Sequence, residues 1–192
     1  MNLRTLAVLA LLASGCSAEI EVQTTPVDLS IPVTSVGLDG FAELAIPMPE
    51  EARGSITVIS VEGQAFAVNP SDGTTLQFQL YVLPFGVQGT ATAEAPFLFT
   101  EANPPAYFPQ ALPLVAPTTF GPGSRTAQTI TNPQLAAAVR QETMWLVAAN
   151  TVSSLGLGDA LPLQLDLEGL TFKVIVTKSF EGSAGGMDVL GL

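Results

Sequence analysis

Histidine is absent from this chain of 192 residues, and cysteine occurs only once. Because histidine is the commonest general base near neutral pH, its absence excludes catalytic arrangements of the Ser-His-Asp and Cys-His kinds. It also excludes the usual zinc sites, whose ligand sets are built from several histidines and cysteines. The sequence contains neither a P-loop nor a GxGxxG motif followed by an acid. We therefore predict no catalytic residues, no metal site and no cofactor.

Basic residues are also scarce, since 6 lysines and arginines face 17 aspartates and glutamates and leave a net charge of −11. Nucleic-acid binding requires a basic stripe that displaces counterions from phosphates, so a nucleic-acid partner is excluded. Charged residues make up 12% of the chain and hydrophobic residues 47%, and there are 17 glycines and 15 prolines. Low charge combined with many turn-forming residues argues against disorder and favours a compact β protein with many loops.

The first fifteen residues have the organisation of an export signal. Arg4 gives the start of the chain a positive charge, residues 6–13 form an apolar run, and small residues follow at Ser14 and Gly15. The apolar run is far shorter than the roughly 20 residues that a membrane-spanning helix needs. It therefore predicts a segment that directs export and is then removed.

The signal ends with a short motif, Leu12-Ala13-Ser14-Gly15-Cys16. This motif resembles the lipobox of bacterial lipoproteins. The resemblance covers only the first sixteen residues. It implies that the chain is cut between Gly15 and Cys16, that the Cys16 thiol carries diacylglycerol through a thioether, and that the new amino group is acylated. Because two acyl chains are enough for stable attachment to a bilayer, it implies a lipid-anchored protein of the cell envelope.

Two further observations bear on this anchor. Cys16 is the single cysteine and so has no disulfide partner within the chain, which disfavours the alternative of an ordinary secretory signal followed by an accidental or buried thiol. In lipoproteins the residue after the cysteine influences sorting, and Ser17 is not the aspartate associated with retention in the inner membrane. The resemblance therefore implies the outer membrane as the location.

The sequence divides into four expected parts. These are a signal peptide at residues 1–15, a lipidated tether at residues 16–26, a folded domain at residues 27–181 and a flexible tail at residues 182–192. The tail joins a glycine-rich stretch to a mildly apolar end. This pattern fits either an undocked tail or a last strand added to a sheet.

Alternation of apolar and polar residues predicts β-strands through most of the folded domain. It is found at residues 27–33, 44–48, 76–82, 161–167 and 170–176. Pro32 lacks the N–H that a sheet ladder needs, so the first of these strands is expected at a sheet edge. The last two are predicted to form an antiparallel hairpin that turns at Gly169. Residues 56–68 fit either a hairpin around Gly63 or one long strand.

One segment departs from the β pattern. Asn132 followed by Pro133 is typical of a helix start, and an alanine-rich stretch comes next. The end of this helix stays open, because residues 144–149 fit either its continuation or a strand. Seven or more short strands and one helix predict an all-β, mainly antiparallel fold, namely a β-sandwich with one helical insertion beginning near Pro133.

Two pairs of strand residues are weak catalytic candidates. Asp166 and Glu168 lie on one face of a predicted strand, at a spacing that suits acid and base roles in a glycosidase. The alternative, which we favour, is the solvated face of a strand whose other face is all leucine. Lys178 and Ser179 have the composition of a Ser-Lys dyad, but adjacent strand residues point to opposite faces.

The turn at residues 69–73 is a candidate calcium site. Asn69, Ser71 and Asp72 offer side-chain oxygens, and calcium binds six to eight oxygen ligands. The same residue types also form turns for conformational reasons of their own. We favour a turn without a metal.

The proline-rich residues 103–123 are the last candidate. They exceed the length of an ordinary connection and carry Tyr107, Phe108 and Phe120. Aromatic side chains on a stiff, extended backbone suit a loop that binds a partner. The alternative, which we favour, is a crossover whose aromatic side chains close one end of the sandwich core.

Three classes of function remain open. The leading one is a noncatalytic, membrane-anchored envelope lipoprotein that acts as a binding or structural module and has an envelope protein as its partner. The second is a carrier of an apolar ligand, suggested by the hydrophobic composition. The third, a hydrolase that uses carboxylates alone, has the least support.

Overall fold

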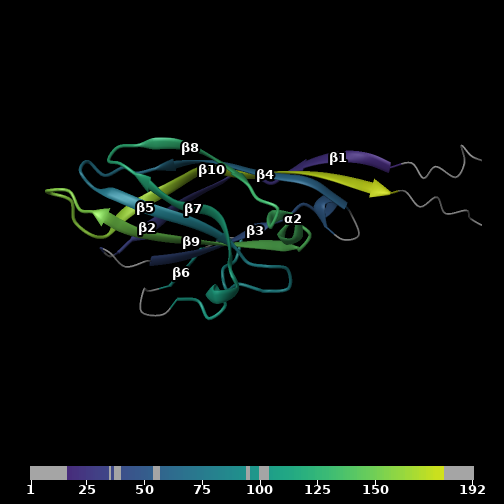
Figure 1. Cartoon of the computed structure of the whole chain (residues 1–192), viewed down its shortest axis with the longest axis horizontal. Helices are drawn as coiled ribbons and strands as arrows, with labels where there is room; N and C mark the ends of the chain where they lie inside the picture. The colour runs from purple at the N-terminus through teal and green to yellow at the C-terminus, as the bar shows by residue number, and fades with distance from the viewer. Residues whose placement is uncertain are drawn as a thin grey trace, which may run out of the picture.

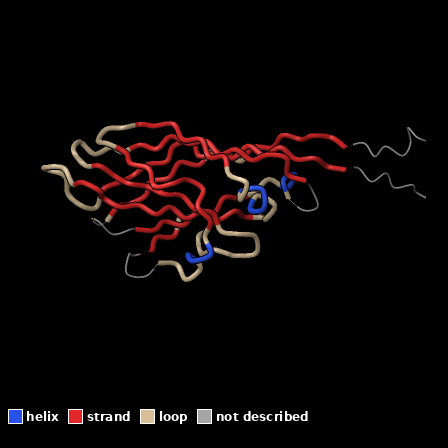
Figure 2. The backbone as a smooth tube through the Cα atoms, viewed as in Figure 1, coloured by secondary structure: helices blue, strands red, loops and turns tan. Residues whose placement is uncertain are grey.

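The computed structural model describes residues 17–34, 36, 40–53, 57–93, 96–99 and 104–179. These residues form two antiparallel sheets that pack face to face (Figures 1 and 2). The predicted all-β, mainly antiparallel sandwich is therefore confirmed. Cys16, the predicted signal peptide and the predicted tail lie outside the described residues.

The first sheet is built around β10 (Leu163–Ser179). On one side β10 pairs with β4 (Thr57–Val68), which in turn pairs with β8 (Arg125–Thr131). On its other side β10 pairs with β2 (Val27–Val33) along its first half and with β1 (Ser17–Gln23) along its second half. The single strand β10 thus holds three others together.

The second sheet has its strands in a different order along the chain. Its order across the sheet is β6 (Phe97–Phe99), β3 (Gly40–Pro47), β9 (Thr143–Ser154), β5 (Thr75–Val82) and β7 (Leu112–Phe120). The central strand β9 is buried at every position from 146 to 152, without the usual alternation. A strand with this burial has both of its faces covered. Residues 144–149, whose structure the sequence left open, are therefore strand and not helix.

The main core lies between the two sheets. Its largest fully buried side chains come from both of them and include Ile31, Leu76, Leu80, Phe120, Leu146, Leu165 and Phe172. Full burial of one such side chain contributes about 1.5–3 kcal/mol. The predicted alternation in β5 is confirmed, because Leu76, Phe78, Leu80 and Val82 are all buried. The edge position predicted from Pro32 is also confirmed, since among the described strands β2 pairs only with β10.

The helical elements are short. The predicted insertion is a single turn, α2 (Leu135–Ala138). Just before it, the Asn132 Oδ1 atom accepts a hydrogen bond from the Gln134 N–H at 2.9 Å, which forms an Asx turn. The described residues also contain the 3-10 turns η1 (Glu50–Ala52) and η2 (Phe108–Gln110). Within the described ranges, no helix has the length and apolar character needed to cross a bilayer.

The hairpin predicted around Gly169 is wrong. Residues 163–179 form one continuous strand, and Gly169 has a φ of 62° inside it. The pairing shifts register at this point against both β2 and β4. A glycine with positive φ serves a β-bulge as well as a turn, and here it bends the strand without reversing it.

Residues 57–68 also form one strand, β4, and not a hairpin around Gly63. A β-carbon at Gly63 would lie 2.7 Å from the Cε1 atom of Phe172. The glycine therefore provides room for a core ring beneath the strand. Gly169 in β10 and Gly63 in β4 both suggested turns from the sequence. In the structure Gly169 lies at a β-bulge, and Gly63 makes room for a neighbouring ring.

The segment predicted as a tether, residues 16–26, instead contains β1. This strand pairs with β10 at every position from Ser17, opposite Ser179, to Gln23, opposite Lys173. The Lys173 Nζ and Glu21 Oε2 atoms form an ion pair at 2.8 Å across the two strands. Figure 2 shows β1 and the end of β10 extending beyond the second sheet. We call the paired segments of β1 and β10, residues 17–23 and 173–179, the ribbon. On the other side of β10, β4 pairs along it as far as Thr57, opposite Thr177.

Candidate functional site

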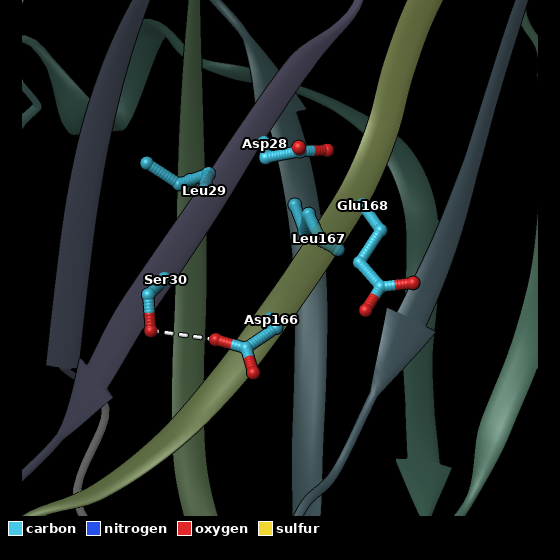
Figure 3. A pocket seen from close by; sticks show the side chains of 6 residues that line it. All are labelled: Asp28, Leu29, Ser30, Asp166, Leu167 and Glu168. Atoms are coloured by element: carbon cyan, nitrogen blue, oxygen red, sulfur yellow. Dashed lines mark hydrogen bonds between the residues drawn. The ribbon is translucent and has the colours of Figure 1, made fainter.

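An acidic hollow lies where β2 meets β10 on the outer face of the first sheet (Figure 3). It has a volume of about 530 Å³ and is lined by Asp28, Leu29, Ser30, Asp166, Leu167 and Glu168. Asp166 and Glu168 are on its outer face, as predicted, because the neighbouring leucines of β10 point into the core and are buried. The hollow thus brings the two predicted carboxylates together with a third, that of Asp28.

Each of these carboxylates already has a partner. The Ser30 hydroxyl donates to Asp166 Oδ1 at 2.6 Å, and the backbone N–H of Gly169 donates to Asp28 Oδ1 at 2.7 Å. The Arg125 Nε atom lies 3.0 Å from Glu168 Oε2.

The directions of the same side chains argue against a shared reaction centre. In Figure 3 the Asp166 carboxylate points towards β2, whereas the Glu168 carboxylate lies on the opposite side of β10. No group of three or more acids, histidines or cysteines arranged for a metal occurs among the described residues. The arrangement suits the solvated face that we favoured for Asp166 and Glu168. The side chains of Lys178 and Ser179 lie outside the described part of the chain.

The turn at residues 69–73 is held by the buried side chain of Asn69. Its amide nitrogen donates to the carbonyls of Thr74, Phe120 and Gly121 at 2.8–3.0 Å. Its Oδ1 atom accepts hydrogen bonds from the N–H and the hydroxyl of Ser71. An oxygen that already accepts from two donors is oriented towards them and not towards a cation. The geometry therefore favours a structural turn over a calcium site.

The same turn braces the loop between β9 and β10, residues 155–162, which we call the distal loop. The Asp159 Oδ2 atom accepts from the Thr74 hydroxyl at 2.6 Å and from the Gly73 N–H at 3.2 Å. The Gly156 N–H donates to the Thr74 hydroxyl at 3.0 Å. A β-carbon at Gly156 would lie only 2.4 Å from the backbone of Gly73, so the two chains are in close contact.

Sequence reasoning missed the apolar surface of this loop. Leu157 is fully exposed, with 107% of its reference area, and Leu155 and Leu161 are also exposed. Val36, which is exposed too, bridges to Val152 at the end of β9. In Figure 1 the distal loop lies at the end of the molecule opposite the start of β1. Leucines beside glycines in a loop between two strands were the available signal.

The three aromatic residues of the predicted partner-binding loop do not form one surface. Phe120 is buried in the main core, where its ring lies 6.4 Å from that of Phe78. Tyr107 and Phe108 are half-buried on the outer face of the second sheet, and the Phe108 ring lies 4.6 Å from that of Phe41. β7 carries Phe120 into the sandwich, while the preceding turn, with Tyr107 and Phe108, stays outside.

A buried carboxylate, Glu43, lies beneath the covering of this second sheet. Its Oε1 atom accepts hydrogen bonds from the backbone N–H groups of Thr90 and Ala91, and its Oε2 atom has no partner among the described residues. Burial raises the pKa of the Glu43 carboxyl, and the two backbone hydrogen bonds oppose that shift. Sequence reasoning missed this residue, although an acid in the middle of an apolar run was a visible signal.

Neither a protein family nor a curated protein sequence matches this chain. Among solved structures, it is similar to a chain of infectious bursal disease virus, Gx strain, with a TM-score of 0.40 and 12% identity over 88% of this chain and 33% of that one. A chain of the T13 particle of the same virus gives a TM-score of 0.42 and 13% identity over 83% and 34%. The chain thus spans about a third of these viral chains. A likeness this weak carries no argument about function.

Proposed function

We propose that this protein is a noncatalytic binding module that lipid on Cys16 holds at the bacterial envelope, with the outer membrane as its location. One observation carries the proposal: the two ends of the domain differ in kind (Figure 1). Cys16 directly precedes β1 at the end where the ribbon emerges, and the braced, leucine-bearing distal loop is at the opposite end. Such a domain has one end suited to attachment and another suited to contact.

The ribbon supports this division of roles. Seven paired positions join β1 to β10, which gives a structured connection of roughly 23 Å at 3.3 Å per residue. A connection of this kind would hold the body of the domain away from the headgroups more firmly than a flexible tether. The net charge of −11 would also keep the body away from anionic lipid.

The interior supports binding at the surface over the carriage of an apolar ligand. Large side chains from both sheets meet in the main core, and Leu80, Leu146 and Phe172 among them are fully buried. Protein interiors packed in this way leave few voids larger than a water molecule. A hollow between β2 and β3, lined in part by Leu29, Leu44 and Ile46, has a volume of about 90 Å³, whereas ligand pockets measure roughly 300–1,000 Å³. The second candidate, a carrier, is therefore less favoured.

The lipid anchor is tested by mass spectrometry of the mature protein from a bacterial host that processes lipoproteins. We expect an amino-terminal Cys16 that carries diacylglycerol and an amide-linked acyl chain, together with recovery in the outer-membrane fraction. Cys16→Ser should remain uncleaved and unacylated. A matched variant, Ser17→Asp, should keep the lipid but move to the inner membrane. A free Cys16 thiol in the mature wild-type protein would overturn the proposal.

A further inference from the structure

We propose that the distal loop is a docking element whose leucines enter an apolar pocket, rimmed by lysine or arginine, on a protein partner. This inference deepens the proposed function and rests on it only for the place where the partner is found. Contiguous apolar side chains on a protein surface are typical of interaction sites. Leu155, Leu157 and Leu161 are exposed within eight residues of one another, and Leu157 exposes its whole side chain.

The loop is ordered before it meets a partner. Thr74 is fully buried, and its hydroxyl both donates to Asp159 and accepts from the Gly156 N–H. Asn69 in turn holds the Thr74 carbonyl, so the brace is continuous with the body of the sandwich. A preorganised loop loses little conformational entropy on binding, which favours affinity. Leucines on such a support suit insertion into a pocket.

Charge selects the kind of partner. Asp159 is the only charged residue of the distal loop, Asp72 is exposed on the bracing turn, and neither segment contains lysine or arginine. A cationic rim around the pocket would complement these carboxylates. A second copy of the chain would instead bring acids against acids. Anionic lipid would be repelled in the same way.

The test begins with a photo-crosslinking leucine analogue at position 157, in cells that produce the full chain. The matched control carries the analogue at position 85. Phe85 is also exposed, but it follows the carboxyl end of β5, whereas the distal loop lies beside the start of that strand. We expect a protein adduct from position 157 and none from position 85. The crosslinked peptide of the partner should line an apolar pocket with lysine or arginine at its rim.

Binding of the purified partner then measures the contribution of each feature. Leu157→Ser should weaken the Kd about tenfold or more, as for an anchor residue of an interface. Thr74→Val, which removes the hydroxyl of the brace at nearly constant volume, should weaken it by a smaller factor. Rising ionic strength should weaken binding further. Thermal unfolding of each variant shows that the domain itself is intact.

Several results would overturn the inference. They are the absence of an adduct at position 157, an adduct formed equally from position 85, an adduct only with lipid or with a second copy, and an unchanged Kd for Leu157→Ser. The Cys16→Ser chain separates this inference from the proposed function. If purified Cys16→Ser binds the partner as tightly as wild type, docking stands whatever holds the protein in the envelope. If mass spectrometry finds acylated Cys16 but position 157 gives no adduct, the docking inference is overturned and the lipid anchor is not.

Discussion

The outer face of the first sheet is open to solvent, whereas that of the second sheet is covered by the segments that contain Gly89 and Phe108. The open face carries Asp166 and Glu168, whose partners are a hydroxyl and an exposed arginine. The covered face carries Glu43, which is fully buried and bonded to backbone N–H groups. The same functional group is therefore part of a solvated surface on one sheet and part of a second core on the other.

The largest effect should separate the main core from this second core. Phe120→Ala removes a ring that is buried between the sheets, and we expect it to lower the free energy of unfolding by about 3–5 kcal/mol. Phe108→Ala removes a half-buried ring from the outer cluster and should lower it by about 2 kcal/mol. Urea unfolding of both variants measures the difference. An equal loss of unfolding free energy in the two variants would show that the covered face contributes as much to stability as the main core.

The two kinds of carboxylate should also respond differently to pH. Burial raises the pKa of Glu43 in the folded state above its ordinary value of 4.5, so the folded state binds the proton more tightly than the unfolded chain. The contribution of Glu43 to stability is therefore greatest below that ordinary value and is lost as pH rises through the folded-state pKa. Relative to Glu43→Gln, the wild type should become less stable as pH increases.

This pH dependence is measured by urea unfolding of the wild type and Glu43→Gln in parallel, from about pH 4 upwards, so that all other carboxylates cancel in the difference. Their free-energy difference should change in the stated direction. A difference that is constant with pH, or that changes in the opposite direction, would contradict the assignment of a buried, raised Glu43.

The smallest effect belongs to the open face. Glu168→Gln breaks the contact with Arg125, but the two side chains are 45% and 52% exposed, and surface ion pairs contribute about 0–1 kcal/mol. We expect a change of this size in urea unfolding at low salt and a smaller one at high salt. A loss of several kcal/mol would remove the distinction between the two faces.

Local patterns in the sequence predicted the elements whose structure is decided locally. The alternation in residues 76–82 gave a half-buried strand, Pro32 marked an edge, and Asn132 marked a helical turn. The strand follows from side-chain periodicity and the edge from the N–H that Pro32 lacks. The helical turn follows from the Asn132 side chain, which accepts from a nearby backbone N–H. Such features depend little on what packs against them.

The misses depend on distant partners. Gly169 has the positive φ that a turn needs, but pairing with β2 and β4 on both sides keeps the strand extended. Residues 19–23 alternate as a strand does, yet only their pairing with β10 distinguishes them from a tether. Glu43 and Leu157 could not be ranked as buried and exposed without the segments around them. The candidate surfaces were therefore less predictable than the fold.

The pairing of β1 with β10 has a consequence for the order in which the chain becomes folded. The Thr24 hydroxyl accepts a hydrogen bond from the N–H of Phe172, a residue 148 positions further along the chain. The first strand and the centre of its sheet therefore cannot assemble until almost all of the domain has been synthesised. Because such distant contacts form slowly, we expect the first sheet to remain unassembled while the amino terminus undergoes the proposed signal cleavage and acylation. That delay would suit the export that we propose, in which the chain crosses a membrane while it is still extended.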